Sequence, residues 1–120
     1  MANPFTYLEL HSTDAGKAKA FYTELFGWKA KDTPVPGLGV YTEIQTQEGP
    51  EAGLMAQQQK GAPSAWLAYV RVPVLDDAVS HAQKLGGKVA TPRTEIKEVG
   101  WFAIVQDPSG ASIGLFEKKG

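Results

Sequence analysis

The sequence predicts an α+β fold made of two tandem βαβββ modules, the first over residues 1–60 and the second over residues 61–120. The first indication is in residues 5–26, where the pattern of a strand runs directly into that of an amphipathic helix. The second is that the same order of elements returns in the second half of the chain. Matching residues stand sixty positions apart, as Ala18 does from Ala78 and Leu25 from Leu85. We therefore expect one domain, residues 1–120, that contains a duplicated unit.

The first strand has one apolar and one polar side. Leu8 and Leu10 alternate with Tyr7, Glu9 and His11, and successive side chains of a strand point to opposite faces of its sheet. Because the two leucines form the only apolar side, the helix should pack on them. The three polar residues should then line the face that points away from the helix.

The helix that follows has a predicted beginning and end. Asp14 suits the N-cap, because its carboxylate can accept hydrogen bonds from the unpaired amides of the first turn. Gly27 stands where a glycine commonly ends a helix. Between them, apolar residues fall on one stripe of the helix: Ala18, Phe21, Tyr22, Leu25 and Phe26.

Three more strands complete the first module in this prediction. Residues 28–34 indicate a short strand closed by a loop with proline and glycine, and residues 39–46 have the β-branched and aromatic content of a strand. Residues 51–57 are expected to form the last strand, although they include a glycine. The polar segment 58–64 then links the two modules.

The second module repeats this order. A strand over residues 66–72 leads into a helix over 74–85, which Gly86 and Gly87 should end. The sequence then predicts a short strand at 88–91, a strand at 98–106, the DPSG turn at 107–110 and a closing strand at 111–117.

Composition excludes several classes of function. The chain has 120 residues, a formal net charge of −1 and no basic run, so no nucleic-acid partner is expected. Cysteine is absent, which excludes disulfides, thiolate metal sites and a cysteine nucleophile. No apolar run has the length of a membrane span, and the N-terminus lacks the apolar core of a signal peptide. We expect a soluble cytoplasmic protein that has no membrane partner.

Three stretches carry a family resemblance: STDAGKAKAFYTELFGW in the first half, and LGGKV and FAIVQDPSGASIGLFE in the second. They resemble the vicinal oxygen chelate superfamily, which holds glyoxalase I, bleomycin-resistance proteins and extradiol dioxygenases, and especially its small bacterial glyoxalase/bleomycin resistance members. The resemblance implies that the strands of both modules curl into one mixed sheet. This sheet would be a half-open barrel with the helices on its convex face and a small-molecule ligand on its concave face. The resemblance also implies a homodimer.

The repeat and the alternation of side chains suggest which residues line the concave face. Tyr69 and Arg71 occupy positions like those of the polar row on the first strand, and Arg71 is expected to pair with Glu9. Phe116 should point inward from the closing strand, and Met55 corresponds to Phe116 in the first module. Trp101 is added because its ring could stack on a planar ligand. The predicted ligand-binding residues are Tyr7, Glu9, His11, Met55, Tyr69, Arg71, Trp101 and Phe116.

The resemblance also locates the metal-binding positions of the family. Its metalloenzymes hold a divalent ion with four side chains, usually His, Gln or Glu, from the first and last strands of each module. Here those positions correspond to Tyr7, Gly53, Leu67 and Gly114. Glycine and leucine have no ligand atom in the side chain, and a neutral phenol is a poor ligand for such an ion. We therefore predict no metal ligand, no catalytic residue and no cofactor.

Without the ion, nothing at these positions would polarise a carbonyl or lower the pKa of a bound water. The preferred interpretation is metal-independent binding of a small, planar organic molecule, of the resistance or sequestration type. One alternative is a glyoxalase-like lyase or isomerase with a relocated divalent metal site and with Glu9 or His11 as the base. The other alternative is a regulatory or accessory module.

Overall fold

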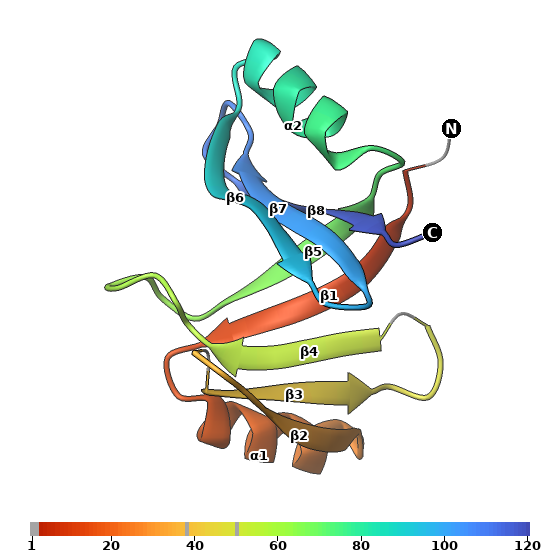
Figure 1. Cartoon of the computed structure of the whole chain (residues 1–120). Helices are drawn as coiled ribbons and strands as arrows, with labels where there is room; N and C mark the ends of the chain where they lie inside the picture. The colour runs from red at the N-terminus through yellow and green to blue at the C-terminus, as the bar shows by residue number, and fades with distance from the viewer. Residues whose placement is uncertain (1–2, 38, 50) are drawn as a thin grey trace. The chain divides into compact units, whose positions relative to one another are not determined.

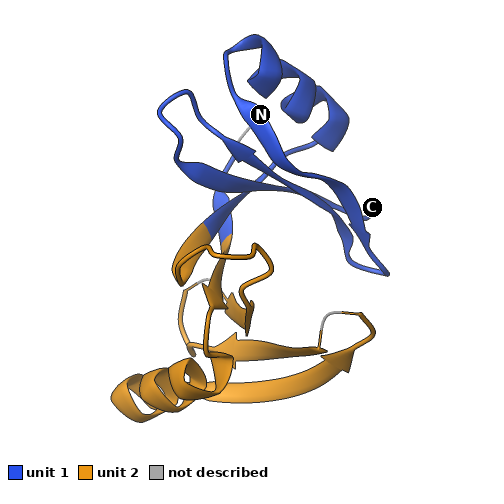
Figure 2. Cartoon of the chain, turned by 90° about the vertical axis from the view of Figure 1, so that its left-hand side faces the viewer, with its two compact units in different colours: residues 1–6, 68–120 blue, residues 7–67 orange. Residues whose placement is uncertain are grey.

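The computed structural model describes residues 3–37, 39–49 and 51–120. Over these residues the chain forms eight strands and two helices, in the order βαβββ followed by a second βαβββ (Figure 1). The predicted α+β fold with two such modules is confirmed. The backbone divides into two compact units, residues 7–67 and residues 68–120 with the chain before Tyr7 (Figure 2). That the whole chain is a single domain stays a prediction.

Module one has a four-stranded mixed sheet. The strand order is β2-β3-β4-β1. β1 and β4 run parallel, whereas β3 is antiparallel to both β2 and β4. α1 lies against this sheet (Figure 1). The elements are β1 (Phe5–Ser12), α1 (Ala15–Phe26), β2 (Lys29–Val35), β3 (Gly39–Gln45) and β4 (Glu51–Ala56).

Module two repeats the arrangement. Its strand order is β5-β8-β7-β6, with β5 and β8 parallel and β7 antiparallel to both of its neighbours. α2 lies against this second sheet (Figure 1). The elements are β5 (Ala65–Arg71), α2 (Leu75–Lys84), β6 (Lys88–Ile96), β7 (Gly100–Gln106) and β8 (Ser112–Lys118).

Both predicted caps of α1 are confirmed. The Asp14 carboxylate accepts a hydrogen bond from the amide of Lys17, 3.1 Å away, and so satisfies one of the unpaired donors of the first turn. Gly27 ends the helix with φ of 69°, a left-handed conformation that costs glycine little. In the described residues, neither helix has the length and apolar character needed to cross a membrane.

Each helix covers the apolar face of its own sheet. Leu10 is buried below α1, whose Ala15 and Ala18 pack against the same cluster, so the helix lies on the leucine side of β1 as predicted. That cluster consists of Leu10, Ile44, Ala52 and Leu54, with Ala15, Ala18, Tyr22 and Trp28 packed on it. The corresponding buried cluster below α2 is Val72, Leu75 and Ala103.

β6 is longer than predicted. It runs to Ile96, so the predicted end at Thr91 is wrong. Pro92 follows Thr91 directly, and proline cannot donate to a strand ladder. β6 lies at the end of its strand order, and its register with β7 shifts between Val89 and Thr91 and again between Thr91 and Thr94. An edge strand with such irregularities accommodates a proline without losing a needed hydrogen bond.

Candidate functional site

The polar row predicted on β1 lies on the sheet face of module one that is opposite α1. In the parallel register of β1 with β4, Glu9 pairs with Gly53 and His11 pairs with Met55. Register partners point to the same side of a sheet. The structure therefore brings four predicted site residues to one face: Tyr7, Glu9, His11 and Met55.

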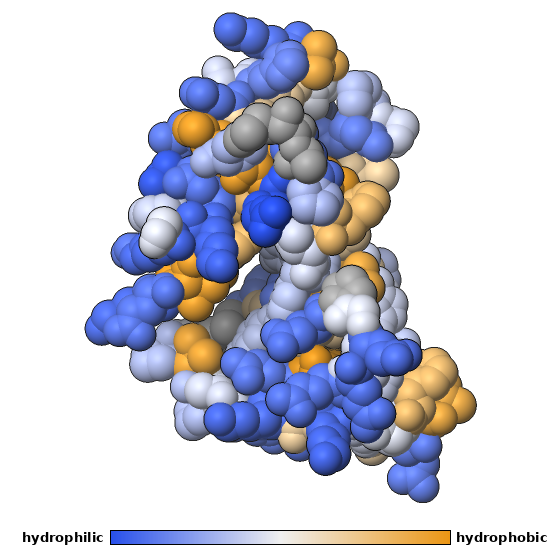
Figure 3. Space-filling model, turned by 90° about the vertical axis from the view of Figure 1, so that its right-hand side faces the viewer, coloured by the Kyte–Doolittle hydropathy of each residue, from blue (hydrophilic) through white to orange (hydrophobic). Residues whose placement is uncertain are grey.

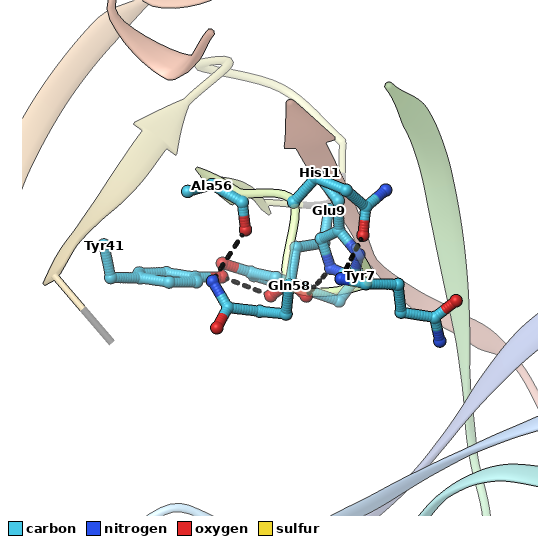
Figure 4. Close-up of polar contacts among 8 residues, drawn as sticks. Tyr7, Glu9, His11, Tyr41, Ala56 and Gln58 are labelled. Atoms are coloured by element: carbon cyan, nitrogen blue, oxygen red, sulfur yellow. Dashed lines mark hydrogen bonds and ion pairs between the residues drawn. The ribbon is translucent and has the colours of Figure 1, made fainter. Parts of the chain in front are cut away.

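A chain of short hydrogen bonds joins three of these residues to Tyr41 on β3 (Figure 4). The hydroxyl oxygens of Tyr7 and Tyr41 are 2.6 Å apart. The Tyr41 hydroxyl donates to Glu9 Oε2 over 2.7 Å. On the other side of the carboxylate, His11 Nε2 lies 2.6 Å from Glu9 Oε1. These four residues are called the Tyr–Glu–His cluster below.

The burial of Glu9 explains why its carboxylate needs these short hydrogen bonds. Glu9 is 8% exposed, although carboxylates are seldom buried unless they are paired. Removing a carboxylate from water costs several kcal/mol unless charge-assisted hydrogen bonds replace its hydration. Here Tyr41 donates such a bond to one carboxylate oxygen, and His11 donates another to the other oxygen. The predicted pair of Glu9 with Arg71 stays a prediction.

The two phenols of the cluster keep their protons at neutral pH. Burial raises the pKa of Tyr7 to about 12, and the negative charges of Glu9, Glu43 and Glu51 add to this effect. Burial also raises the pKa of Tyr41, and the neighbouring Glu9 carboxylate acts in the same direction. Both residues are therefore hydrogen-bond donors under ordinary conditions.

Gly53 makes room for the cluster. A Cβ atom at this position would overlap the Tyr41 hydroxyl oxygen and would lie 2.5 Å from the Tyr7 hydroxyl oxygen. Real Cβ atoms do not come so close, so the two tyrosines can meet only above a glycine. The glycine that the sequence places in the last strand of module one is thus part of the local packing.

Module two has a similar close approach on its own sheet. Tyr69 is the register partner of Gly114, and a Cβ atom at Gly114 would lie within 2.8 Å of several ring carbons of Tyr69. Phe102 and Phe116 are register partners on β7 and β8, and the ring centroids of Tyr69 and Phe102 are 6.3 Å apart. Arg71 pairs in register with Phe116. The predicted residues Tyr69, Arg71 and Phe116 thus share one face.

Trp101 lies on the other face of that sheet. It packs with Leu115 against the cluster below α2. Arg93 lies over its ring, with the guanidinium carbon 4.9 Å from the centroid, and the Lys119 ammonium is 5.2 Å from the same centroid. The structure therefore does not group Trp101 with Tyr69 and Phe116. Stacking of a ligand on Trp101 stays a prediction.

Tyr41 and Phe102 were not among the predicted residues. The facing of β3, which carries Tyr41, could not be fixed from the sequence. The signal was Gly53: a glycine inside an apolar strand often marks the close approach of another group. In β7, the alternation that places Trp101 on the helix side places its neighbour Phe102 on the opposite side.

Two hollows lie on module one, one on each side of its sheet. The polar hollow has a volume of about 340 Å³ and lies at the end of the face that carries Tyr7, the register partner of Glu51. Its lining is Lys29, Gln45, Thr46, Gln47, Gly49 and Glu51. The apolar hollow, of about 460 Å³, is lined by Leu8, Tyr22, Phe26, Trp28, Thr46, Glu48, Ala52 and Trp66.

With this geometry in place, comparison with known proteins identifies the family. A sequence model described as "Glyoxalase/Bleomycin resistance protein/Dioxygenase superfamily" matches residues 5–115. The chain belongs to this superfamily. The resemblance found in the three sequence stretches is thereby confirmed.

Curated relatives of the superfamily support the assignment. The chain is 36% identical over 115 residues to a Mycobacterium bovis protein named "Putative glyoxylase CFP32", and this match covers 92% of the chain and 44% of the relative. It is 28% identical over 126 residues to "Anthracycline biosynthesis protein DauV" of Streptomyces sp. (strain C5), covering 93% of the chain and 46% of the relative. The chain thus spans less than half the length of these relatives.

A solved structure supports the fold. Methylmalonyl-CoA epimerase from Mycobacterium tuberculosis superposes with a TM-score of 0.70, covering 97% of this chain and 88% of the epimerase chain. The two sequences are only 14% identical, so this likeness concerns the fold alone.

The residues at the four positions that the resemblance assigns to metal ligands do not suit a divalent ion. A side chain at Gly53 or Gly114 would overlap the tyrosine groups that lie there. Leu67 offers only hydrocarbon, and the Tyr7 phenol stays protonated with its pKa near 12. Over the described part of the chain, no three His, Cys, Asp or Glu side chains are grouped so that they could hold a metal ion.

Proposed function

We propose that this chain binds a small, planar organic molecule without a metal ion, in the manner of resistance or sequestration proteins of its superfamily. One observation carries the proposal. At Gly53 and at Gly114 tyrosine groups fill the space that a ligating side chain would need. The first and last strands that supply metal ligands in related enzymes supply tyrosine packing in this chain instead.

The Tyr–Glu–His cluster is the proposed centre of binding. Small-molecule sites commonly combine aromatic walls with a few placed polar groups, and the face around Glu9 offers tyrosine rings, a carboxylate, an imidazole and Met55. The name of the Streptomyces relative refers to anthracycline biosynthesis, which supports a small organic ligand. Contacts from Tyr69, Arg71, Trp101 and Phe116 remain part of the prediction.

Two measurements on one preparation test the proposal. Metal content is determined after purification without chelators, and melting temperatures are recorded with nickel, zinc, manganese and iron. We expect no stoichiometric metal and no large stabilisation. A panel of planar antibiotics and metabolites should instead contain a compound that raises the melting temperature, because a ligand at 100 times its Kd adds about 2.7 kcal/mol to the free energy of unfolding.

Variants locate the site. His11→Ala should abolish the response to the stabilising compound, because it removes a group that contacts Glu9. Thr94→Ala, at an exposed residue of β6, should leave that response unchanged. A stabilising, stoichiometric ion would contradict the proposal. It would favour a glyoxalase-like enzyme, the activity in the name of the mycobacterial relative, with Glu9 or His11 as the base.

We also propose that the chain forms a homodimer through the outer surface of α1. Phe21, Leu25 and Phe26 on this helix are each more than half exposed, and Trp66 is 41% exposed beside the apolar hollow. Hydrophobic groups, in orange, also reach the surface in the view of Figure 3. Such patches on soluble domains often mark contact surfaces.

Sedimentation velocity tests this second proposal. The unchanged chain should sediment as a dimer, and Phe26→Ser should shift it to a monomer. Val40→Ser removes an equally exposed apolar side chain, 51% exposed, from β3 and should leave the dimer intact. A chain that remains monomeric at high micromolar concentration would show the proposal to be wrong.

A further inference from the structure

The direction of the hydrogen bonds in the Tyr–Glu–His cluster can be worked out from the number of available protons. Each phenol carries one proton, and the proton of Tyr41 is donated to Glu9 Oε2. In the short contact between the two hydroxyls, Tyr41 must therefore accept and Tyr7 must donate. His11 Nε2 is the donor toward Glu9 Oε1, since an ionised carboxylate only accepts. The protons of these three hydrogen bonds thus point inward, toward Glu9.

This direction determines what the cluster can offer to a bound molecule. The Tyr7 and Tyr41 protons are committed to the chain of hydrogen bonds, so neither hydroxyl can donate to an anionic or carbonyl group of a ligand without breaking that chain. The charge at the centre of the cluster is the negative charge of Glu9. A ligand that approaches this face therefore meets acceptor atoms and a carboxylate.

The face that carries Glu9 also carries other charged groups, both carboxylates and lysines. Glu43 pairs in register with Gly53, and Glu51 pairs with Tyr7, so both carboxylates share the face with Glu9. Lys31 is the register partner of Glu43 on edge strand β2, and Lys29 lines the polar hollow with Glu51. The two lysines therefore lie beside Glu43 and Glu51. At the Tyr7 hydroxyl, the negative charges of Glu9, Glu43 and Glu51 raise the pKa.

We propose that the ligand of this face is a planar organic cation or another planar molecule that presents N–H donors, and that Glu9 provides the selectivity. This inference rests on the proposed small-molecule binding and names the chemical class of the ligand. A protonated amine compensates the buried negative charge, whereas a carboxylate ligand meets like charge and finds no available phenol donor.

Three naphthalene probes of matched shape test the class of ligand: 1-naphthylmethylammonium, 1-naphthylmethanol and 1-naphthoate. Their binding is titrated calorimetrically at pH 8, where an ordinary imidazole is neutral. The cation should bind at least about tenfold more tightly than the anion, with the alcohol between them, and this preference should shrink at high salt.

Two substitutions of equal charge change show where the selectivity arises. Glu9→Gln should bring the cation and the alcohol to within about twofold of each other, because the central charge is gone. Asp32→Asn removes the same charge from the opposite face, where Asp32 bonds Lys19 of α1, and should leave the preference unchanged. If Glu9→Gln does not fold, Glu43→Gln at an exposed position of the same face should reduce the preference by about threefold.

The outcomes separate this inference from the proposed function. If the anion or the alcohol binds as tightly as the cation, the inference is wrong but small-molecule binding stands. If Asp32→Asn lowers the preference as much as Glu9→Gln does, the selectivity is a general effect of net charge and the inference is also wrong. If none of the three probes and no compound of the broader panel binds, the proposed function itself fails.

Discussion

The two modules share one packing feature, but different groups surround it in each. In each, a glycine of the last strand lies below tyrosine: Gly53 below Tyr7 and Tyr41, and Gly114 below Tyr69. In module one the tyrosine hydroxyls meet over the glycine and lead to a buried carboxylate. In module two the glycine contacts the ring itself, and the neighbouring ring is that of Phe102.

The difference shows how a duplicated scaffold can specialise. The strand register and the glycine are common to both halves, but the residue paired with the glycine differs: Glu9 pairs with Gly53, whereas Tyr69 pairs with Gly114. The residue that the third strand contributes differs as well: Tyr41 in module one and Phe102 in module two. Differences on the first and third strands together give one face a polar cluster and the other an aromatic pair.

The largest expected loss of stability comes from changing the glycines that lie below tyrosine. Gly114→Ala should destabilise the protein by about 3 kcal/mol, because the new Cβ would collide with one edge of the buried Tyr69 ring, which cannot move alone. Gly53→Ala should cost less, about 1 to 2 kcal/mol, because it meets mainly the hydroxyl ends of side chains, which can shift. Urea unfolding gives both free energies.

A third glycine serves as the control for these two variants. Gly16 lies in α1, and a Cβ there would have only Asp14 Oδ1 at 3.8 Å as a near neighbour. Gly16→Ala should therefore be neutral or slightly stabilising. If Gly53→Ala proved as costly as Gly114→Ala, the two modules would be packed equally tightly and the comparison would fail.

Alkaline pH should weaken the polar cluster of module one. The pKa of Tyr7 is about 12 in the folded protein, against an ordinary value of 10.0. The protonated form is thus favoured by folding, so the stabilisation from Tyr7 is fully present below pH 10 and is lost as pH rises through 12. The loss should reach about 3 kcal/mol, since each pKa unit corresponds to 1.36 kcal/mol.

Unfolding free energies measured between pH 9 and pH 12 check this sign and size. Tyr7→Phe lacks the titrating group and should show a clearly smaller loss over the same range. An equal loss in Tyr7→Phe would assign the alkaline sensitivity to other groups of the molecule.

At neutral pH, removing the hydroxyl of Tyr41 should destabilise the protein more than removing the hydroxyl of Tyr7. Tyr41→Phe takes a donor from the buried Glu9 carboxylate and should cost about 2 kcal/mol, because hydrogen bonds to charged groups are worth more than neutral ones. Tyr7→Phe removes the bond between the two hydroxyls, in which no charged group takes part, and should cost about 1 kcal/mol. Equal costs would mean that Tyr41 does not donate the hydrogen bond to Glu9, contrary to the order Tyr7, Tyr41, Glu9 in the chain of hydrogen bonds.

The sequence predicted the modules because their signals are local. The alternation around Leu8 and Leu10, the cap at Asp14 and the glycine at Gly27 each depend on neighbours in the chain. The full length of β6 was not predicted, because a strand can contain Pro92 at a sheet edge and the place of β6 in the sheet cannot be found from local sequence.

The cluster could be predicted only in part, because it depends on register. Glu9 and His11 lie two residues apart on one strand, so their common face follows from alternation alone. Tyr41 comes from β3, and its position above Gly53 depends on how β3 pairs with β4. A shift of that pairing by one residue would turn Tyr41 to the other face, and nothing local in the sequence excludes such a shift.

The smallest expected effects come from one carboxylate in each module. Asp32 accepts from Lys19 Nζ over 2.9 Å and from Thr42 Oγ1 over 2.7 Å, and these bonds lower its pKa. Asp107 accepts from the backbone and hydroxyl of Ser109 within its turn, which lowers its pKa as well. A lowered pKa means that the stabilisation is present above the ordinary value of 3.8 and is lost as pH falls through the folded value.

The two carboxylates should differ in their dependence on salt. Asp32→Asn loses an ion pair with a lysine, so its destabilisation should shrink in 1 M NaCl. Asp107→Asn keeps an oxygen that can accept the bonds of the turn, so its smaller destabilisation should change little with salt. Both differences should disappear in acid, because the protonated carboxyl of the unchanged protein then resembles the amide. A salt-sensitive Asp107→Asn beside a salt-insensitive Asp32→Asn would contradict the roles assigned to the two carboxylates.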